Sequence, residues 1–523
     1  MLNKSTHQGF SGSRSLLALA ATVLIGSLPL EAGWSAEGRV PLETAAVMAP
    51  LDIPRQISMP TFEQLLDEAK QIGVDTVSVD VWWGKVEQQG DQQFDWSYYD
   101  EVFGKIRAKG LKIVPILSFH KCGGGPGDDC DIPIPSWLYT HFSQIGITAN
   151  DLKYESETGR LQDDAIVPWA TTKPAVLDQF REFMQAFATH YAAHADDFIE
   201  LNISLGPTGE LRYPSYNHTD GWNYPERGYF QSYSALAQAS FRDWALGKFG
   251  GLSGVAKRWG MSLASPAEIQ VPGGNLPPTT GKRAETFVND KTYADTPYGR
   301  DFIDWYNASL VEHGHRMLVA ADAALDGGAF QSIPLGMKIP GIHWQMMPCS
   351  PHPRIAEITA GLVQTTLNLK TDSTAQKESA TQAKSSPRAD GYGYQKIMDM
   401  IADVKRQTDR DVILHFTAAE MDNDSACGDG NSMAEALVFW ISQGAQDHNI
   451  RHKSENALAC VAAPGDDRTW ENIRNVFSST SYRGFTLLRL VNHGCSDATG
   501  GPWGTDKAAY ASFIHDYRTP SKP

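Results

Sequence analysis

Eight short apolar runs alternate with helical patterns along this chain, and that alternation constrains the fold more than any other feature. The runs are residues 47–51, 75–83, 111–119, 198–205, 333–344, 412–417, 449–455 and 484–490. Thr61 is expected to cap the first helix, and Gly73 and Gly110 to end the first two helices. Such strand–helix–strand repeats predict parallel strands joined by right-handed crossovers. Eight of them predict a single α/β domain, a closed (β/α)8 TIM barrel with long loops on its C-terminal face.

Two segments do not fit this repeat. Lys4 and Arg14 precede an apolar run over 16–30 that is too short for a good membrane span. We interpret residues 1–46 as a signal peptide and leader, with an uncleaved anchor as the alternative, and residues 47–523 as the barrel. Residues 364–388 are rich in Ser, Thr, Gln, Ala and Lys without apolar periodicity, which predicts a flexible surface insertion. We expect an exported protein, secreted or periplasmic, that has no membrane association once the signal is removed.

The formal net charge of −16 makes nucleic acid or an anionic membrane surface an unfavourable partner. A neutral substrate suits this charge better than a phosphorylated one. We therefore expect no nucleic-acid partner and a neutral ligand. A monomeric protein is a separate expectation.

Six cysteines in an exported chain make disulfides permissible. Cys122 and Cys130 close a short loop and are the expected pair. The other four each follow one of the last four strands, and their pairing stays open: they are Cys349, Cys427, Cys460 and Cys495. A cysteine-based metal site is less favoured, because no C-x-x-C spacing occurs.

Polar and aromatic side chains follow seven of the eight apolar runs. In chain order they are Asp80 and Trp82; His120 and Asp128; Glu210; Lys338, His343 and Trp344; Thr417 and Glu420; Glu455, Asn456, Ala457 and Leu458; and Arg489. The carboxyl ends of barrel strands share one face, so we expect these side chains to surround one site. Hydrolysis of a glycosidic bond needs two carboxyl groups, and Glu210 and Glu455 are the best-placed pair. Flat faces for sugar rings are offered by Trp82, Tyr216 and Trp344, and partners for hydroxyl groups by Asp80, His120, Lys338 and Arg489.

Several separate segments together resemble one known family. They read VDVWWGKVE, HKCGGGPGDDC, GPTGELRYPSY, KIPGIHW, FTAAEM and SENAL. These segments, in this order, resemble the β-amylases, the inverting exo-acting glucanases of glycoside hydrolase family 14. The resemblance runs from about residue 47 to the chain end, broken mainly by the 364–388 insertion, and no starch-binding module is seen. It implies a (β/α)8 barrel that releases β-maltose from the non-reducing ends of α-1,4-glucans such as starch and maltodextrins.

The resemblance also implies a role for each matching residue. Glu210, in GELRYP, would be the general acid and Glu455, in ENAL, the general base, with carboxyl groups about 6.5–9.5 Å apart and no cofactor needed for the chemistry. Asp128 matches the acid of a flexible lid, and Thr417 matches a mobile inner-loop threonine. Glucose-contacting positions are matched by Asp80, His120, Lys338, His343, Asn456, Ala457 and Arg489. Apolar subsite walls are matched by Trp82, Tyr216, Trp344 and Leu458.

The stretch VEQQGDQQFD further resembles bacterial members of the family. There Glu87, Asp91 and the backbone at Gln92 would bind a structural Ca²⁺ together with Glu182 from a later helix. Oxygen-rich ligation of this kind suits calcium. An expected glutamate is replaced by Gln179, which lowers the charge of this predicted site.

Some residues depart from the family pattern, and other readings compete with it. Thr208 stands beside the acid where alanine is usual, and Ala418-Ala419 replaces a bulkier pair. Taken alone, Glu210 could be only an ion-pair partner of Arg212, and Asp128 only a turn residue. A retaining glycosidase acting on β-linked sugars is one rival function. A catalytically inactive glucan-binding protein is another.

Overall fold

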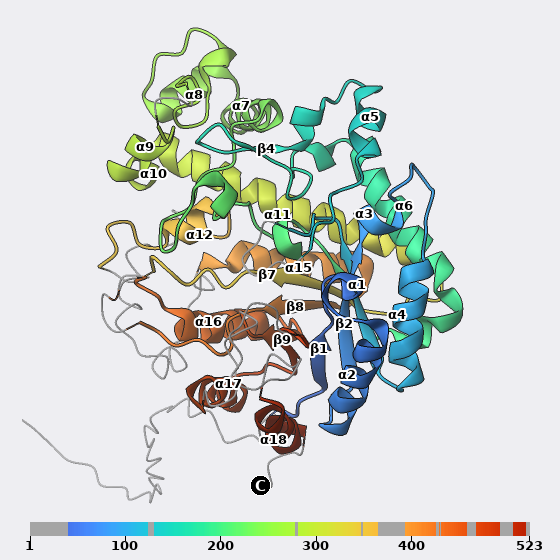
Figure 1. The fold of residues 1–523 in the computed structure, drawn as a ribbon. Helices are drawn as coiled ribbons and strands as arrows, with labels where there is room; N and C mark the ends of the chain where they lie inside the picture. The colour runs from blue at the N-terminus through green and yellow to red at the C-terminus, as the bar shows by residue number, and fades with distance from the viewer. Residues whose placement is uncertain are drawn as a thin grey trace, which may run out of the picture. The chain divides into compact units, whose positions relative to one another are not determined.

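The computed structural model describes residues 40–123, 130–277, 281–346, 349–364, 393–424, 428, 430–457, 467–491 and 506–518. Its centre is a closed barrel of parallel strands in the order β1-β10-β9-β8-β7-β6-β3-β2 (Figure 1). The predicted (β/α)8 fold is therefore confirmed. Among the described residues, no helix combines the length and the apolar character needed to cross a bilayer.

All eight predicted strands are present, and most are shorter than the runs that predicted them. They are β1 Thr44–Met48, β2 Thr76–Trp82, β3 Lys112–Ser118, β6 Leu201–Ile203, β7 Leu335–Ile339, β8 Val412–Phe416, β9 His452–Glu455 and β10 Gly484–Leu487. β7 begins after Pro334 and ends before Pro340, because proline has no N–H to give to the ladder. β1 lies before the predicted 47–51, since it pairs with β10 from Thr44 to Val47 and Pro50 cannot extend it. A small antiparallel hairpin, β4 Tyr154–Glu155 and β5 Leu161–Gln162, lies outside the barrel.

Helices connect and cover the strands. They are α1 Ile53–Gln56, α2 Met59–Gln71, α3 Trp83–Val86, α4 Ser97–Ala108, α5 Trp137–Ser143, α6 Pro174–His190, α7 Ala235–Phe249, α8 Leu252–Trp259, α9 Glu285–Asn289, α10 Thr292–Asp295, α11 Pro297–Leu325, α12 Ile355–Thr359, α15 Gln395–Thr408, α16 Ala434–Asp447, α17 Asp467–Ser479 and α18 Lys507–Arg518. Gly73 and Gly110 have φ of +97° and +66°, as expected of glycines that end helices. The prediction that Thr61 caps α2 is wrong. Ser58 is the cap, and its side chain accepts a hydrogen bond from the backbone N–H of Thr61 (3.2 Å).

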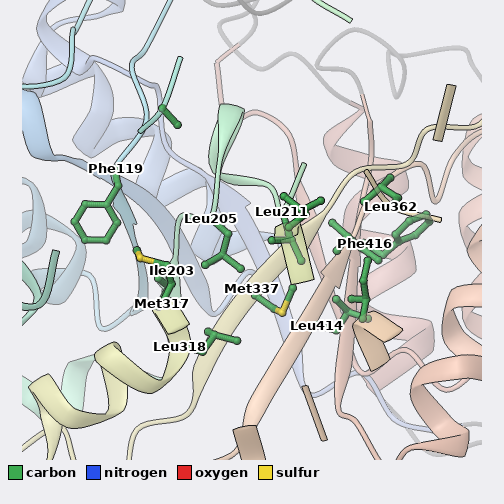
Figure 2. Packing of buried hydrophobic residues seen from close by; sticks show 14 of the residues in the cluster. Phe119, Ile203, Leu205, Leu211, Met317, Leu318, Met337, Leu362, Leu414 and Phe416 are labelled. Carbon is green, nitrogen blue, oxygen red and sulfur yellow. The ribbon is translucent and has the colours of Figure 1, made fainter. Parts of the chain in front are cut away.

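Alternate residues of each strand point to opposite sides of the barrel wall. The outward-facing ones, such as Ile203, Met337 and Leu414, join an apolar layer with Met317 and Leu318 of α11 (Figure 2). All five side chains are buried. The long helix α11 is thereby fixed against the strands that carry the residues after β6 and β7.

The inward-facing side chains include a buried group of charges. Glu200, which is fully buried, accepts hydrogen bonds from Lys453 Nζ (2.6 Å) and from His415 Nε2. Burial alone would raise the pKa of Glu200, but His415 and Lys453 outweigh it and lower that pKa to about 2. Room for these side chains comes from glycine: a Cβ on Gly336 would lie 2.1 Å from Glu200 Oε1, and one on Gly484 2.9 Å from Lys453.

We predict that Glu200→Gln destabilises the fold by about 3–5 kcal/mol, because it leaves Lys453 buried beside a neutral group. Because the pKa of Glu200 falls from 4.5 to about 2 on folding, its contribution is complete above pH 4.5 and is lost as the pH falls toward 2. Urea unfolding of wild type and variant at several pH values measures both effects. Asp403→Asn is the matched control, since its ion pair with Arg406 is exposed and contributes little. Equal unfolding free energies for wild type and Glu200→Gln at pH 7 would contradict the prediction.

Candidate active site

A cleft of about 470 Å³ opens at the carboxyl ends of the barrel strands. Every strand, or the loop that follows it, contributes to its lining: Met48, Asp80, His120, Glu210, Lys338, Thr417, Glu455 and Arg489 come from β1, β2, β3, β6, β7, β8, β9 and β10 in turn. The expectation that strand ends converge on one site is therefore met.

Most of the predicted site residues line this cleft. They are Asp80, Trp82, His120, Glu210, Tyr216, Lys338, His343, Trp344, Thr417, Glu455, Ala457 and Arg489. Asn456 is fully buried, and its side chain donates to the carbonyl oxygen of Leu488 (2.8 Å) and accepts from the N–H of Leu488 (2.7 Å). Its side chain therefore joins the loops after β9 and β10. Asp128 and Leu458 lie outside the described residues.

Glu210 stands just after β6, beyond a tight turn. A Cβ on Gly206 would lie 2.7 Å from the carbonyl oxygen of Glu210 and 2.8 Å from that of Arg212, so only glycine allows this approach. Glu210 Oε2 accepts hydrogen bonds from Arg212 Nε (2.8 Å) and from Thr208 Oγ1 (2.9 Å). The side chain of Glu210 is 13% exposed. Glu210 therefore forms an ion pair with Arg212 and also lines the cleft.

Glu455 is the last residue of β9, and its side chain is only 2% exposed. Its Oε2 accepts a hydrogen bond from Lys338 Nζ (2.9 Å). The backbone carbonyl of Lys338 in turn accepts from the N–H of Leu211 (2.8 Å), next to Glu210. One residue of β7 therefore contacts both segments that carry the two carboxylates.

Two histidines in the cleft wall are held neutral. Burial, reinforced by the positive charges of Arg212, Lys338 and Arg489, lowers the pKa of His120 to about 3. Burial also lowers the pKa of His343 to about 4. Their Nδ1 atoms lie 2.8 Å from Ser204 Oγ and 2.7 Å from Ser432 Oγ respectively. Both rings are therefore uncharged hydrogen-bonding groups near neutral pH rather than cations.

One wall of the cleft is aromatic, and two of its members were not predicted. Trp222 and Tyr224 join Tyr216 and Trp344, and the ring centroid of Trp344 lies 5.2 Å from Tyr216, 5.6 Å from Trp222 and 5.9 Å from Tyr224. Tyr224 is 51% exposed. In the sequence, the only indication of these two residues is the group of aromatic residues in GWNYPERGYF. This group shows no helical or strand periodicity because the segment is a loop.

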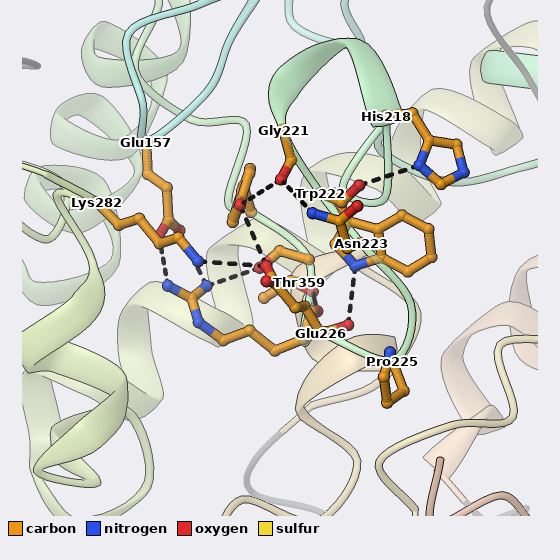
Figure 3. Close-up of polar contacts among 12 residues, drawn as sticks. Glu157, His218, Gly221, Trp222, Asn223, Pro225, Glu226, Lys282 and Thr359 are labelled. Carbon is orange, nitrogen blue, oxygen red and sulfur yellow. Dashed lines mark hydrogen bonds and ion pairs between the residues drawn. The ribbon is translucent and has the colours of Figure 1, made fainter. Parts of the chain in front are cut away.

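The loop that carries Trp222 and Tyr224, residues 217–230, is called the arm below (Figure 3). The carbonyl oxygen of Glu226 accepts hydrogen bonds from the indole Nε1 of Trp222 and of Trp344, each at 2.9 Å. The next residue, Arg227, donates from Nη1 to Glu157 Oε2 (3.0 Å), and Glu157 is fully buried. The same Oε2 accepts from the N–H of Phe230 (2.9 Å). The buried carboxylate of Glu157 therefore holds the arm in place. Through Glu226, the arm in turn orients the indoles of Trp222 and Trp344.

Two residues of the loop after β8 contact neighbouring loops. Glu420 Oε1 accepts from the N–H of Ala457 (2.7 Å), so it supports the segment after Glu455 rather than facing substrate. Thr417 Oγ1 accepts from the N–H of Gly341 (2.9 Å). The loops after β7, β8 and β9 are thereby hydrogen-bonded to one another.

The predicted disulfide adjoins the cleft, since Cys122 is one of the lining residues. Cys122 and Cys130 form a disulfide with Cα atoms 5.6 Å apart, and Cys349 is also disulfide-bonded. The other three cysteines lie outside the described residues. The pairing of Cys349, Cys427, Cys460 and Cys495 stays open.

The calcium candidates come together between the loop after α3 and the helix α6. Glu87 accepts from the N–H of Gln92 (2.6 Å), and Glu182 accepts from Nε2 of Gln92 (3.4 Å) and of Gln179 (3.3 Å). Burial, with the charges of Asp91 and Glu182 added, raises the pKa of Glu87 to about 7. The Oε1 atom of Gln179 is buried without a partner in the described part of the chain. Across that part, no group of three or more His, Cys, Asp or Glu side chains that could hold a metal ion is found.

Comparison with known proteins gives a consistent result. The family model described as glycosyl hydrolase family 14 matches residues 39–377. The thermophilic β-amylase of Thermoanaerobacterium thermosulfurigenes is 33% identical over 455 residues, which cover 87% of this chain and 71% of that protein. The β-amylase of Cytobacillus firmus is 33% identical over 491 residues, covering 93% and 90%.

Solved structures agree with these sequence matches. The crystal structure of the catalytic domain of β-amylase from Paenibacillus polymyxa is similar with a TM-score of 0.72 and 31% identity, covering 92% of this chain and 99% of that one. A β-galactosidase from the psychrophilic Marinomonas ef1, at 13% identity and a TM-score of 0.51, shares the fold alone.

We predict that Arg227→Lys loosens the arm, because lysine cannot replace the paired guanidinium contacts with Glu157. A loss of about 1.4 kcal/mol in local stability makes amide exchange in residues 217–230 about tenfold faster. Hydrogen–deuterium exchange with mass spectrometry measures this. Arg283→Lys is the control, since Arg283 makes a comparable buried pair with Glu155 (2.9 Å) on the same hairpin. Unchanged exchange in the arm, or equal effects of both substitutions on it, would contradict the prediction.

Proposed function

Because the chain belongs to glycosyl hydrolase family 14, we propose that it cleaves α-1,4-glucosidic bonds in starch and maltodextrins from their non-reducing ends, with inversion, releasing β-maltose. The chain is a glycoside hydrolase of the β-amylase group. The observation that carries the finer proposal is the presence of Glu210 and Glu455 in one cleft, with Lys338 in contact with both segments.

Glu210 is the proposed general acid, and it protonates the leaving glycosidic oxygen. Arg212 and Thr208 both donate hydrogen bonds to its Oε2 atom. This arrangement supports a role in which Oε1 carries the proton toward the scissile bond. The match of GELRYP to the family motif assigns the role of acid to Glu210 rather than to Glu455.

Glu455 is the proposed general base, and it takes a proton from the water that attacks the anomeric carbon. A base must be ionised before the reaction, and the ammonium of Lys338 at 2.9 Å stabilises that charge. Direct attack by water inverts the anomeric configuration. We expect the two carboxyl groups to lie about 6.5–9.5 Å apart, which leaves room for this water.

Substrate binding is proposed to use both polar and aromatic groups of the cleft. Asp80, the neutral His120 and His343, and Arg489 are placed to hydrogen-bond sugar hydroxyls, while Tyr216, Trp222, Tyr224 and Trp344 offer ring faces. A neutral polyhydroxylated chain suits such a mixture. The lid role of Asp128, the wall role of Leu458 and any contact with Asn456 stay proposals, as do export directed by residues 1–46 and a monomeric state.

A structural calcium ion is also proposed, outside the cleft. The negative charges of Asp91 and Glu182 lie close enough to Glu87 to raise its pKa. A divalent cation would relieve the repulsion among these three carboxylates. The amide oxygen of Gln179 is buried without a partner in the described chain, and the backbone of Gln92 adjoins Glu87. These oxygen donors are of the kind that calcium prefers. The ion would hold the loop after α3 against α6 and supply no step of the reaction.

The proposed reaction is tested by the anomer of its first product. NMR of maltopentaose during early hydrolysis should show β-maltose before mutarotation. Initial α-maltose, or products other than maltose, would favour a retaining or differently specific glycosidase. Absence of any reducing sugar from soluble starch would favour a catalytically inactive glucan-binding protein.

In the same assay, Glu210→Gln and Glu455→Gln should each lower kcat by about 10²–10⁴-fold, because each removes a proton-transfer group. Binding of maltodextrin, measured by calorimetry, should be retained. Glu312→Gln is the control, as this carboxylate on α11 is 67% exposed and is not among the residues that line the cleft. Activity near wild type in either cleft variant would overturn the assigned roles.

We predict that Ca²⁺ raises the midpoint of thermal unfolding of the metal-stripped protein by about 3 °C at a concentration about a hundredfold above its Kd. The gain should be larger at pH 8 than at pH 5.5, since Glu87, whose pKa is about 7, must lose its proton to bind the ion. Differential scanning fluorimetry measures this, and Glu182→Gln should lose the calcium-dependent gain. A midpoint that is independent of calcium at both pH values would refute the site.

A further inference from the structure

We propose that Thr208 is a positioning residue that fixes the carboxylate of Glu210 through its hydroxyl group. The inference rests on the proposed role of Glu210 as the acid and goes beyond it, because it concerns how that carboxylate is oriented. It explains a residue that differs from the usual alanine beside the acid.

The hydroxyl of Thr208 bridges the two members of an ion pair. Thr208 Oγ1 donates to Glu210 Oε2 (2.9 Å) and accepts from Arg212 Nη2 (3.1 Å). Arg212 Nε donates directly to the same Oε2 (2.8 Å). The three side chains form a closed ring of hydrogen bonds, and the hydroxyl of Tyr216 donates a longer hydrogen bond to the same Oε2 (3.5 Å). Arg212 and Thr208 are the two nearer donors, and two near donors from different directions fix the rotation of a carboxylate about its last bond better than one does.

The backbone of Thr208 adopts a conformation that is unfavourable for threonine. Thr208 has φ of +55° and ψ of +21°, in the left-handed region that β-branched residues avoid at a cost of about 1–2 kcal/mol. Its side chain is exposed at the cleft, so apolar packing does not offset this cost. Glycine would adopt the same conformation freely. What threonine adds at this position is the hydroxyl group and its contacts with Glu210 and Arg212.

The position of the hydroxyl also suits a group that gains and loses a proton in each turnover. Thr208 Oγ1 has one hydrogen and two acceptors in reach, Glu210 Oε2 and the carbonyl oxygen of Pro207 (2.7 Å). It can donate to Oε2 whether or not Glu210 carries a proton on Oε1, because Oε2 remains an acceptor in both states. Arg212 and Thr208 both donate to Oε2, so proton transfer is expected to use Oε1.

Three substitutions separate the hydroxyl from the fold. Thr208→Val keeps the shape and loses the hydroxyl, Thr208→Gly also removes the backbone strain, and Thr208→Ser keeps the hydroxyl. We expect Thr208→Val and Thr208→Gly to lower kcat on maltopentaose about tenfold with KM within about twofold, and Thr208→Ser to recover most of that loss. Thr208→Gly should unfold at a temperature equal to or above that of wild type, which shows that the lost activity is not lost stability.

The outcomes that overturn the inference are distinct. Wild-type kcat in Thr208→Gly would show that the hydroxyl does not position Glu210, and this variant carries the test if Thr208→Val fails to fold. A serine variant as slow as the valine variant would assign the effect to the methyl group instead. If Glu210→Gln keeps its activity, the proposed acid itself is wrong. If Glu210→Gln is inactive and the Thr208 variants are not, only the role of Thr208 falls.

Discussion

The structure depends on how charges are paired inside the barrel. Lys338, His415 and Lys453 lie at corresponding positions of the adjacent strands β7, β8 and β9. The two lysines need carboxylate partners, because an unpaired buried charge is among the most destabilising features of a fold. Lys453 and His415 share Glu200 on one side, and Lys338 turns to Glu455 on the other. The barrel interior therefore holds two separate groups of paired charges. The Lys338–Glu455 pair is the one that lies in the cleft.

This division places the proposed base and the proposed acid in different mechanical settings. Glu455 belongs to β9 and is held from the neighbouring β7, so its position follows that of the barrel wall. Glu210 belongs to a loop after β6, and its position depends on local contacts with Arg212 and on the turn at Gly206. The aromatic wall depends on loops as well, and there a single backbone oxygen of Glu226 orients two indoles. Rigid elements therefore define the site, and buried ion pairs extend that order into the loops.

Much of this could be predicted from sequence because it rests on local signals. Apolar runs and helix-ending glycines are local, and they gave eight strands in the right order; the errors at β7 came from prolines inside an apolar run. Glu210 and Glu455 could be singled out because each lies at or shortly after the end of a strand, and both line the cleft. Glu157 and Glu200 were not, since each looks like an ordinary acid until the fold brings Arg227, or His415 and Lys453, against it. Pairing over such separations leaves no mark in a single sequence.

The two carboxylates of the cleft each face a cation, so charge pairing alone does not distinguish acid from base. What differs is their access to water. Glu455, the proposed base, is enclosed with the ammonium group of Lys338 and is only 2% exposed. An acid must regain a proton after each turnover, and at 13% exposure Glu210 keeps contact with solvent through the cleft. Arg212 restrains Glu210 at one oxygen and leaves the other for the substrate, and a partner reaching both oxygens would have closed that route. The asymmetry of the pair, one buried and one open, therefore suits the proposed roles of Glu455 as base and Glu210 as acid.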